Sequence, residues 1–140
     1  MITYEDIEAL NDSYAYWTEP EAHYATPMQM VKYFKEFTGQ EGTPQLYLNL
    51  IDEEIQEWMN EVYDKDGEEP EAELKELADL VYVIYGYALS KGWNLDEALY
   101  RVHVNNILRV KQPDGTVKKR EDGKILKVDN SPKVRLEDLV

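Results

Sequence analysis

The feature that most constrains this fold is a pair of acidic clusters, each set inside a helical, otherwise apolar pattern. Each cluster pairs carboxylates three residues apart: Glu54 with Glu57, and Glu76 with Asp79. Positions three or four apart lie on one face of a helix, within side-chain reach of each other. Four carboxylates that converge between two packed helices repel one another unless cations lie among them. The simplest explanation is a Mg²⁺ site, because Mg²⁺ takes oxygen ligands and joins a few carboxylates to substrate phosphates.

Acidic residues on helices more often form a solvated surface, so this alternative has to be weighed against a site. Asp79 directly precedes residues 80–89, which are apolar almost all round and therefore predict a buried helix. An ionised carboxylate beside such a run is costly unless it is paired or bound to a metal. In the preceding helix the acids border the predicted core stripe, which consists of Leu48, Ile51, Ile55, Met59 and Val62. Their position beside the core favours a site.

The charge of the chain is divided unevenly. Of the 140 residues, the first hundred hold 23 acids and 5 Lys or Arg, which gives a net charge of −18. Residues 101–140 hold 6 acids and 10 Lys or Arg, which gives a net charge of +4. Such an acidic chain is a poor nonspecific ligand for nucleic acid, since phosphate neutralisation drives that binding. An acidic metal-binding half joined to a basic tail suits a small polyanion such as a nucleotide. Alternatively, the tail neutralises acidic helices within the fold or in a partner subunit.

Several classes of protein are excluded by composition. The chain has no cysteine, which excludes a disulfide framework, a thiol nucleophile and a zinc–thiolate site. Neither His23 nor His103 lies in the Glu-x-x-His pattern that a ferritin-like di-iron bundle requires. The first residues lack the basic and apolar regions of a signal peptide, and the longest apolar run is too short to span a bilayer. We therefore expect a soluble cytoplasmic protein with no membrane partner.

The chain is predicted to form one all-α domain over residues 1–140: an N-terminal extension (1–26), a helical core (27–110) and a basic C-terminal arm (111–140). Pro27 and Gly39 delimit one core helix, Pro44 opens a second that runs to about residue 64, and a third runs from 70 to about 91. Asn94 caps a fourth to about residue 110, with Glu97 placed for a capping box. A short helix is also predicted near 4–12, before an irregular aromatic stretch over 13–26. Turns at 113–115 and 121–123 predict an extended arm or hairpin.

The order of these motifs resembles the all-α nucleoside triphosphate pyrophosphohydrolases, a superfamily that includes MazG and phosphoribosyl-ATP pyrophosphohydrolase. Its signature is Glu-Glu-x-x-Glu, a variable gap, and Glu-x-x-Asp, which residues 53–57 and 76–79 match. The resemblance covers about residues 28–110, and the tail at 121–127 is similar to that of MazG-like proteins of phages and bacteria. It implies a four-helix-bundle-type MazG-like fold and a homodimer or homotetramer, in the host cytoplasm if a phage encodes the protein.

Carried over position by position, the resemblance implies Mg²⁺, with Mn²⁺ as a substitute, bound by Glu54, Glu57, Glu76 and Asp79. It implies that Glu53 orients or deprotonates the attacking water. Contacts with the nucleotide or its phosphates are implied at Asn106, Arg109, Lys124 and Lys127. Three departures from the pattern bear on the base preference more than on the chemistry. Lys75 stands where many relatives have a second acid, and Arg109 replaces a lysine. Phe34 is followed by Lys35, where several pyrimidine-specific members have a histidine.

The expected reaction converts an NTP or dNTP into its monophosphate and pyrophosphate. Metal ions held by carboxylates neutralise charge and activate water, a spare carboxylate accepts the water's proton, and Lys or Arg balances the leaving pyrophosphate. The chain provides each of these groups without a nucleophilic side chain, so we expect direct attack by water. The alternative from another class is a noncatalytic acidic interaction protein, such as a nucleic-acid mimic. A mimic requires negative charge spread over its surface, whereas an enzyme requires acids that converge at the edge of the core.

Overall fold

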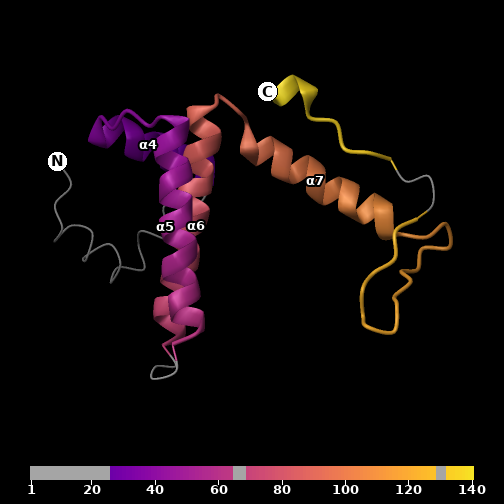
Figure 1. Cartoon of the computed structure of the whole chain (residues 1–140). Helices are drawn as coiled ribbons and strands as arrows, with labels where there is room; N and C mark the ends of the chain where they lie inside the picture. The colour runs from indigo at the N-terminus through magenta and orange to yellow at the C-terminus, as the bar shows by residue number, and fades with distance from the viewer. Residues whose placement is uncertain (1–25, 65–68, 129–131) are drawn as a thin grey trace, which may run out of the picture.

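The chain forms four α-helices in the part that the structure, a computed structural model, describes: residues 26–64, 69–128 and 132–140. They are α4 (Pro27–Thr38), α5 (Pro44–Val62), α6 (Pro70–Ser90) and α7 (Leu95–Val110), and a short 3₁₀ helix, η1 (Glu137–Leu139), follows. Figure 1 shows α5 and α6 as an upright antiparallel pair, α4 across one end of it and α7 extending away. The prediction of an all-α fold is confirmed. The helix expected near 4–12 lies outside the described residues, as does all but the last residue of the irregular stretch at 13–26.

Local side-chain chemistry sets the ends of these helices. Thr26 and Gln29 form a reciprocal capping box at the start of α4, and the Thr43 hydroxyl accepts a hydrogen bond from the Leu46 backbone amide at the start of α5. Gly39 ends α4 in the left-handed conformation, with φ of 66°. The first helical position of each of the first three helices is a proline. The predicted helix starts are therefore confirmed, and α5 and α6 end within two residues of the predicted positions.

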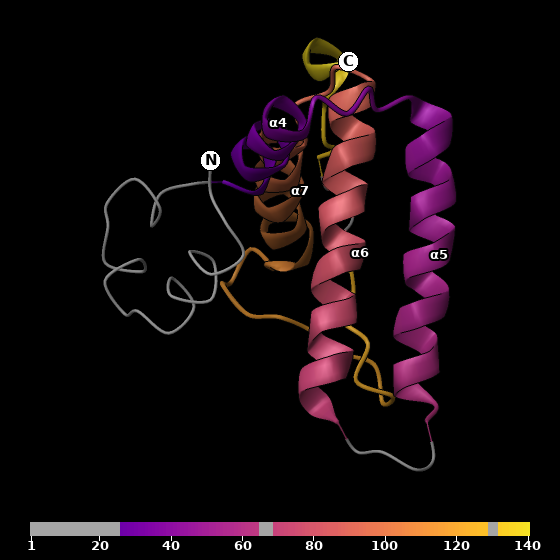
Figure 2. The same ribbon diagram turned by 90° about the vertical axis from the view of Figure 1, so that its left-hand side faces the viewer.

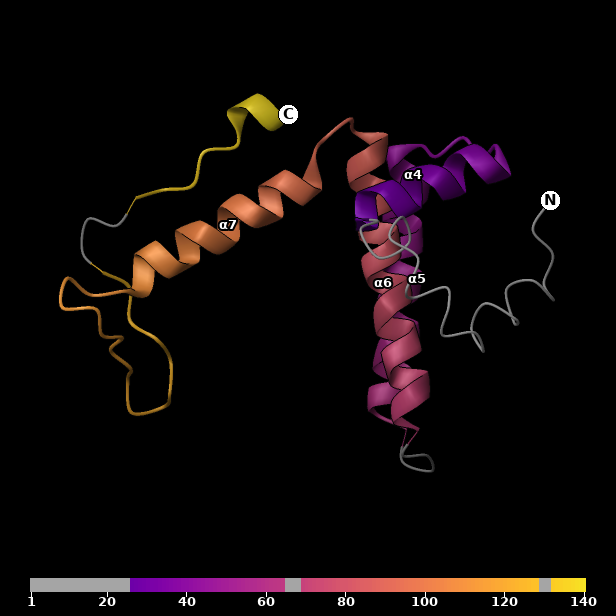
Figure 3. The same ribbon diagram turned by 180° about the vertical axis from the view of Figure 1, so that it is seen from behind.

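The predicted capping box of α7 forms only in part, because its acid has another partner. The Asn94 side chain accepts a hydrogen bond from the Glu97 backbone amide, but the Glu97 carboxylate accepts one from Arg101. Arg101 also donates two hydrogen bonds to Asp138, at 2.6 and 2.9 Å. Together with the amide of Asn105, which donates to the Pro132 carbonyl at 2.8 Å, this arginine holds the C-terminal residues along α7 (Figure 3).

The small core lies where α4 crosses α5 and α6, an arrangement that Figure 2 shows from the side. Four apolar side chains of the described residues are buried there: Val31, Tyr47, Tyr85 and Ala88. The Tyr47 ring lies between two glycines, since a Cβ atom added to Gly42 or Gly86 would come within 2.3 or 2.1 Å of it. Because Gly86 has no side chain, the Tyr47 ring of α5 packs directly against the backbone of α6.

Most of the predicted core surface is exposed in the single chain. In the predicted stripe of α5, Leu48, Met59 and Val62 are 43%, 37% and 41% exposed. On α6, Val81 and Ile84 are exposed as well, so the prediction that residues 80–89 form a fully buried helix is wrong for one chain. The physical reason is that α5 and α6 cover only one face of each other and α4 covers only one end of the pair. Within the described residues, two apolar helix faces therefore remain without a partner.

The basic arm forms two consecutive turns, as predicted. Antiparallel bridges join Lys111 to Val117 and Lys119 to Ile125, without a continuous strand in this segment. Asp114 and Asp122 accept hydrogen bonds from backbone amides two residues on, which stabilises each turn. Figures 1 and 3 place residues 111–128 of the arm beyond the end of α7, to the side of the α5–α6 pair. Among the described residues, no helix has the length and apolar character needed to cross a membrane.

Candidate metal centre

Three of the predicted acids meet between α5 and α6. One oxygen each of Glu54, Glu76 and Asp79 lies within 4.8 Å of the others. Glu54 comes from α5, and the other two lie three residues apart on α6, so both helices must pack together to form the group. All three side chains are half-buried at the edge of the helix pair. The acids thus converge instead of spreading over the surface.

Two oxygens of this group have no hydrogen-bonding partner among the described residues. Glu54 Oε2 and Glu76 Oε2 are both buried, and so is Trp58 Nε1, one turn beyond Glu54 on α5. A buried carboxylate oxygen without a partner costs free energy, which coordination of a metal ion would offset. Divalent cations such as Mg²⁺ prefer a set of donors made only of oxygens. The residues present therefore fit a hard divalent cation.

The electrostatics of these acids also favour a bound cation. Burial, followed by the negative charges of Glu57 and Asp79, raises the pKa of Glu54 from 4.5 to about 7. A hydrogen bond with Glu57 and the charge of Glu76 act in the same direction. Near neutral pH the metal-free cluster therefore retains a proton that a cation can displace.

The two remaining acids of the first motif lie outside the three-residue group. Glu57 is exposed, yet it hydrogen-bonds to Glu54 and so adjoins the group. Glu53 is exposed on α5 next to Glu54. Lys75 adds a cation that the sequence analysis did not assign to the site, because its Nζ lies 2.6 Å from Asp79 Oδ2 and 3.5 Å from Glu76 Oε1. The i,i+4 spacing of Lys75 and Asp79 was the signal for this pair.

The four residues expected to contact substrate do not lie at the acids of their own chain. Asn106 is exposed on α7, and the Arg109 carbonyl accepts a hydrogen bond from the Val128 amide. Lys124 and Lys127 lie on the arm, which Figures 1 and 3 show at a distance from α5 and α6. It is the neighbouring Asn105, 8% exposed, that is buried. A single chain therefore brings the acids together but leaves these four residues apart from them.

A cavity of about 380 Å³ opens beside the acids. Three helices and the loop after α4 contribute its lining residues: Val31, Phe34, Gln40, Tyr47, Leu50, Glu54, Asp79, Tyr82 and Val83. Phe34 and Tyr82 meet edge to face, with ring centroids 5.7 Å apart. This cavity was not expected from the sequence, because residues far apart in the chain form its walls.

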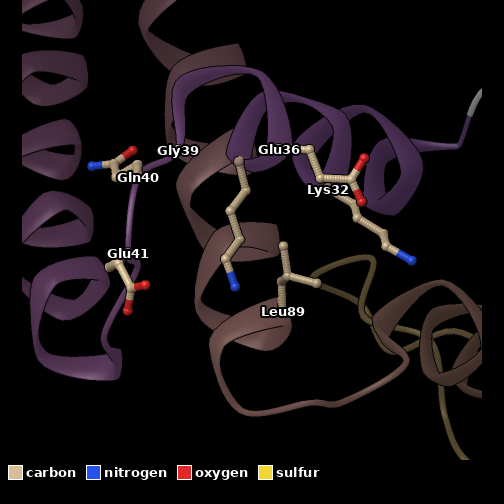
Figure 4. A pocket seen from close by; sticks show the side chains of 7 residues that line it. Lys32, Glu36, Gly39, Gln40, Glu41 and Leu89 are labelled. Carbon is tan, nitrogen blue, oxygen red and sulfur yellow. The ribbon is translucent and has the colours of Figure 1, made fainter.

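A second cavity, of about 260 Å³, lies near the end of α4 and is shown in Figure 4. It is more polar, with side chains of both charges: its lining residues are Lys32, Lys35, Glu36, Gly39, Gln40, Glu41 and Leu89. It contains none of the clustered acids. The first cavity is therefore the one that adjoins the candidate metal centre.

The family model described as phosphoribosyl-ATP pyrophosphohydrolase matches residues 20–106 of the chain. The matched segment contains both acidic motifs and every residue that lines the first cavity. It stops before the basic arm. No curated protein matches the sequence.

Proposed function

The chain belongs to the phosphoribosyl-ATP pyrophosphohydrolase family, within the MazG-like all-α superfamily, and from this premise we propose that it is a Mg²⁺-dependent nucleotide pyrophosphohydrolase. Membership of the family indicates a pyrophosphohydrolase. The proposed reaction converts an NTP or dNTP into the monophosphate and pyrophosphate. The observation that carries the proposal is the group of Glu54, Glu76 and Asp79, whose oxygens converge within 4.8 Å beside a cavity of about 380 Å³. That volume lies within the usual range for small-molecule sites.

The proposed metal ligands are Glu54, Glu57, Glu76 and Asp79, with Mn²⁺ as a substitute for Mg²⁺. The buried oxygens of Glu54 and Glu76 that lack partners support this assignment, as does the hydrogen bond between Glu54 and Glu57. When bound, the ion supplies charge neutralisation and Lewis-acid stabilisation of the phosphoryl oxygens.

Water is the proposed nucleophile. It attacks the α phosphorus, a new P–O bond forms, and the bond to the oxygen that bridges the α and β phosphorus atoms breaks. Pyrophosphate leaves with that electron pair, and Glu53 accepts the proton of the water as a general base. The position of Glu53 on α5, next to a proposed metal ligand, and its exposure to solvent are consistent with this role.

We further propose a homodimer or homotetramer, in which a second copy covers the exposed apolar faces of α5 and α6. Faces this apolar are rare on monomeric proteins and are typical of subunit interfaces. A second copy also brings the residues expected to contact substrate to the acids, because in their own chain α7 and the arm extend away from the helix pair (Figure 1). In this arrangement the arm of one subunit brings Lys124 and Lys127 to the phosphates at the acids of the other, with Asn106 and Arg109 nearby on α7.

A second candidate substrate follows from the description of the family. Phosphoribosyl-ATP is cleaved at the same position, between its α and β phosphates, so the acids would serve both reactions equally. The two candidate substrates differ in the nucleoside part that is joined to the α phosphate and that the cavity would accept. Both therefore belong in one substrate screen.

The test is an assay of pyrophosphate release from the common NTPs and dNTPs and from phosphoribosyl-ATP, run in ¹⁸O-labelled water with Mg²⁺. The expected products are a labelled monophosphate and unlabelled pyrophosphate. A nucleoside diphosphate product, or label found only in released phosphate, would contradict attack at the α phosphorus. Absence of turnover with every substrate, in Mg²⁺ and in Mn²⁺, would favour the noncatalytic acidic protein.

A further inference from the structure

The cavity beside the acids has two chemically different ends. On α5 its lining residues are Tyr47, Leu50 and Glu54, which lie in that order along the helix axis. At 1.5 Å per residue these positions span on the order of 10 Å. The antiparallel helix α6 contributes Asp79, Tyr82 and Val83 in the opposite direction. The acids Glu54 and Asp79 therefore lie at one end of the cavity, and Tyr47 lies at the other.

The loop after α4 closes the Tyr47 end. Gly42 lies against the Tyr47 ring, and two residues earlier Gln40 lines the cavity. The Gln40 side chain is exposed, and among the hydrogen bonds of the described residues only its backbone amide takes part, donating to the Thr38 hydroxyl. Gln40 also lines the second cavity, and Figure 4 shows it there on this loop beyond Gly39, with its amide directed away from Leu89. An amide with a donor and an acceptor is thus available at the end of the cavity that lies opposite the acids.

The walls between these ends are apolar and aromatic. Phe34 and Tyr82 meet edge to face, and the remaining wall residues are Val31, Leu50 and Val83. A nucleotide has matching parts in the same order: a charged phosphate end, a flat ring with apolar faces, and a polar edge that donates and accepts hydrogen bonds. Its length from the α phosphate to the base edge is comparable with that of the cavity.

We propose that Gln40 binds the hydrogen-bonding edge of the nucleobase and thereby sets the base preference of the enzyme. This inference rests on the proposed function, because it takes the acids as the site of the phosphates. The amide is the only side chain of the lining, apart from the acids and the two tyrosine hydroxyls, that can hydrogen-bond to a base. Discrimination by such a group arises because a mismatched base leaves donors or acceptors unpaired.

The test compares Gln40→Leu and Gln40→Glu with the wild type. Glu41→Gln is the matched control, since Glu41 is adjacent on the same loop but lines only the second cavity. The measurement is the Kd of nonhydrolysable α,β-imido analogues of the four common dNTPs in Mg²⁺, with inorganic imidotriphosphate as the ligand that lacks a base. Calorimetry reports binding directly, so the result does not depend on turnover.

We expect Gln40→Leu to weaken the most tightly bound nucleotide by about tenfold and to reduce the spread of Kd among the four bases. Gln40→Glu removes the donor and keeps the acceptors, so it should shift preference toward bases that donate at this edge. Neither variant should alter binding of imidotriphosphate, and Glu41→Gln should leave every Kd unchanged.

The inference is overturned if both Gln40 variants keep the wild-type order of bases, or if they weaken imidotriphosphate as much as the nucleotides. Failure of the proposed function has a different signature, namely nucleotide binding by the wild type without release of pyrophosphate. If the wild type binds no nucleotide at all, both proposals fail together.

Discussion

The ammonium group of Lys75 lies 2.6 Å from the carboxylate of Asp79, one helical turn further along α6. This contact places a positive charge directly at the group of acids proposed to bind Mg²⁺. The Lys75 side chain is 67% exposed, so screening by water leaves the pair only a small contribution to folding. Its main effect is therefore expected on the cation that shares the site.

Replacing this lysine should tighten metal binding. In Lys75→Met the competing charge is removed, and we expect the Kd for Mg²⁺ to fall by about two- to fivefold, with little change in thermal stability. Lys91→Met, near the other end of the same helix, is the control. Calorimetric titration with Mg²⁺ measures the effect. An unchanged Kd would show that Lys75 does not compete with the metal.

Neutralising the proposed ligands should remove the metal and the activity without unfolding the helices. For Glu57→Gln and Asp79→Asn we expect loss of Mg²⁺ binding and of pyrophosphate release, with the circular dichroism retained, because each change keeps the side-chain size. Asp52→Asn changes an exposed acid of α5 outside the group and should behave as wild type. EDTA should abolish the activity of the wild type. Full activity of either ligand variant in EDTA would refute the metal centre.

The raised pKa of Glu54 predicts a pH dependence of stability. The folded-state pKa of about 7 exceeds the ordinary value of 4.5, so folding favours the protonated form. This contribution to stability is fully present below pH 4.5 and is lost as the pH rises through about 7. Without metal, the melting temperature of the wild type should therefore fall relative to that of Glu54→Gln between pH 5 and pH 8, by a few degrees. Parallel curves for the two proteins would exclude this role for Glu54.

The contact between Tyr47 and Gly86 predicts that replacing Gly86 with alanine destabilises the fold, whereas the same replacement usually stabilises a helix. Glycine to alanine inside a helix normally stabilises by about 0.5–1 kcal/mol. In Gly86→Ala the new methyl group would lie 2.1 Å from the Tyr47 ring, so we expect a net destabilisation of about 1–3 kcal/mol. Denaturant titration measures it. Adding Tyr47→Leu should recover part of the loss, because the smaller side chain leaves room for the methyl group.

The proposed action of the arm between subunits can be tested by complementation. Lys124→Met with Lys127→Met should lower kcat/KM by about ten- to a hundredfold, if each lysine contacts phosphate. Co-expression of this double variant with Asp79→Asn should restore about a quarter of the wild-type activity, because half of randomly paired dimers are mixed and each mixed dimer has one intact site. No recovery in mixed dimers would place the lysines at the acids of their own chain. Unchanged kcat/KM in the double variant, with slightly lower thermal stability, would assign them to surface ion pairs.

Much of the secondary structure followed from local signals. Prolines at the first helical positions, Gly39 at the end of α4 and Asn94 before α7 marked boundaries that the structure reproduces, since caps and backbone conformations depend on neighbouring residues. The arm turns were predictable for the same reason. The reciprocal box between Thr26 and Gln29 also has its signature in the sequence, a threonine followed three residues later by a glutamine.

Burial was less predictable, because periodicity shows that a face is apolar but not what covers it. The stripe through Leu48, Met59 and Val62 has the spacing of a core, yet it is exposed in the single chain. Asn105 and Asn106 are neighbours of identical chemistry, and their side chains point about 100° apart on the helix. Only the fold shows that Asn105 is the one that holds the C-terminal residues, through its hydrogen bond to the Pro132 carbonyl.

The sequence by itself determined the helices, the turns and the pairing of acids within each motif, because a helix brings residues three apart onto one face whatever surrounds it. Only the tertiary structure decided that Glu54 of α5 meets Glu76 and Asp79 of α6, and that a cavity runs from Glu54 and Asp79 to Gln40. These contacts join residues from different helices, and their distances depend on how α4, α5 and α6 pack. Packing depends on the shapes of all the side chains at once, such as the fit of Tyr47 against Gly86, and no local pattern encodes that fit.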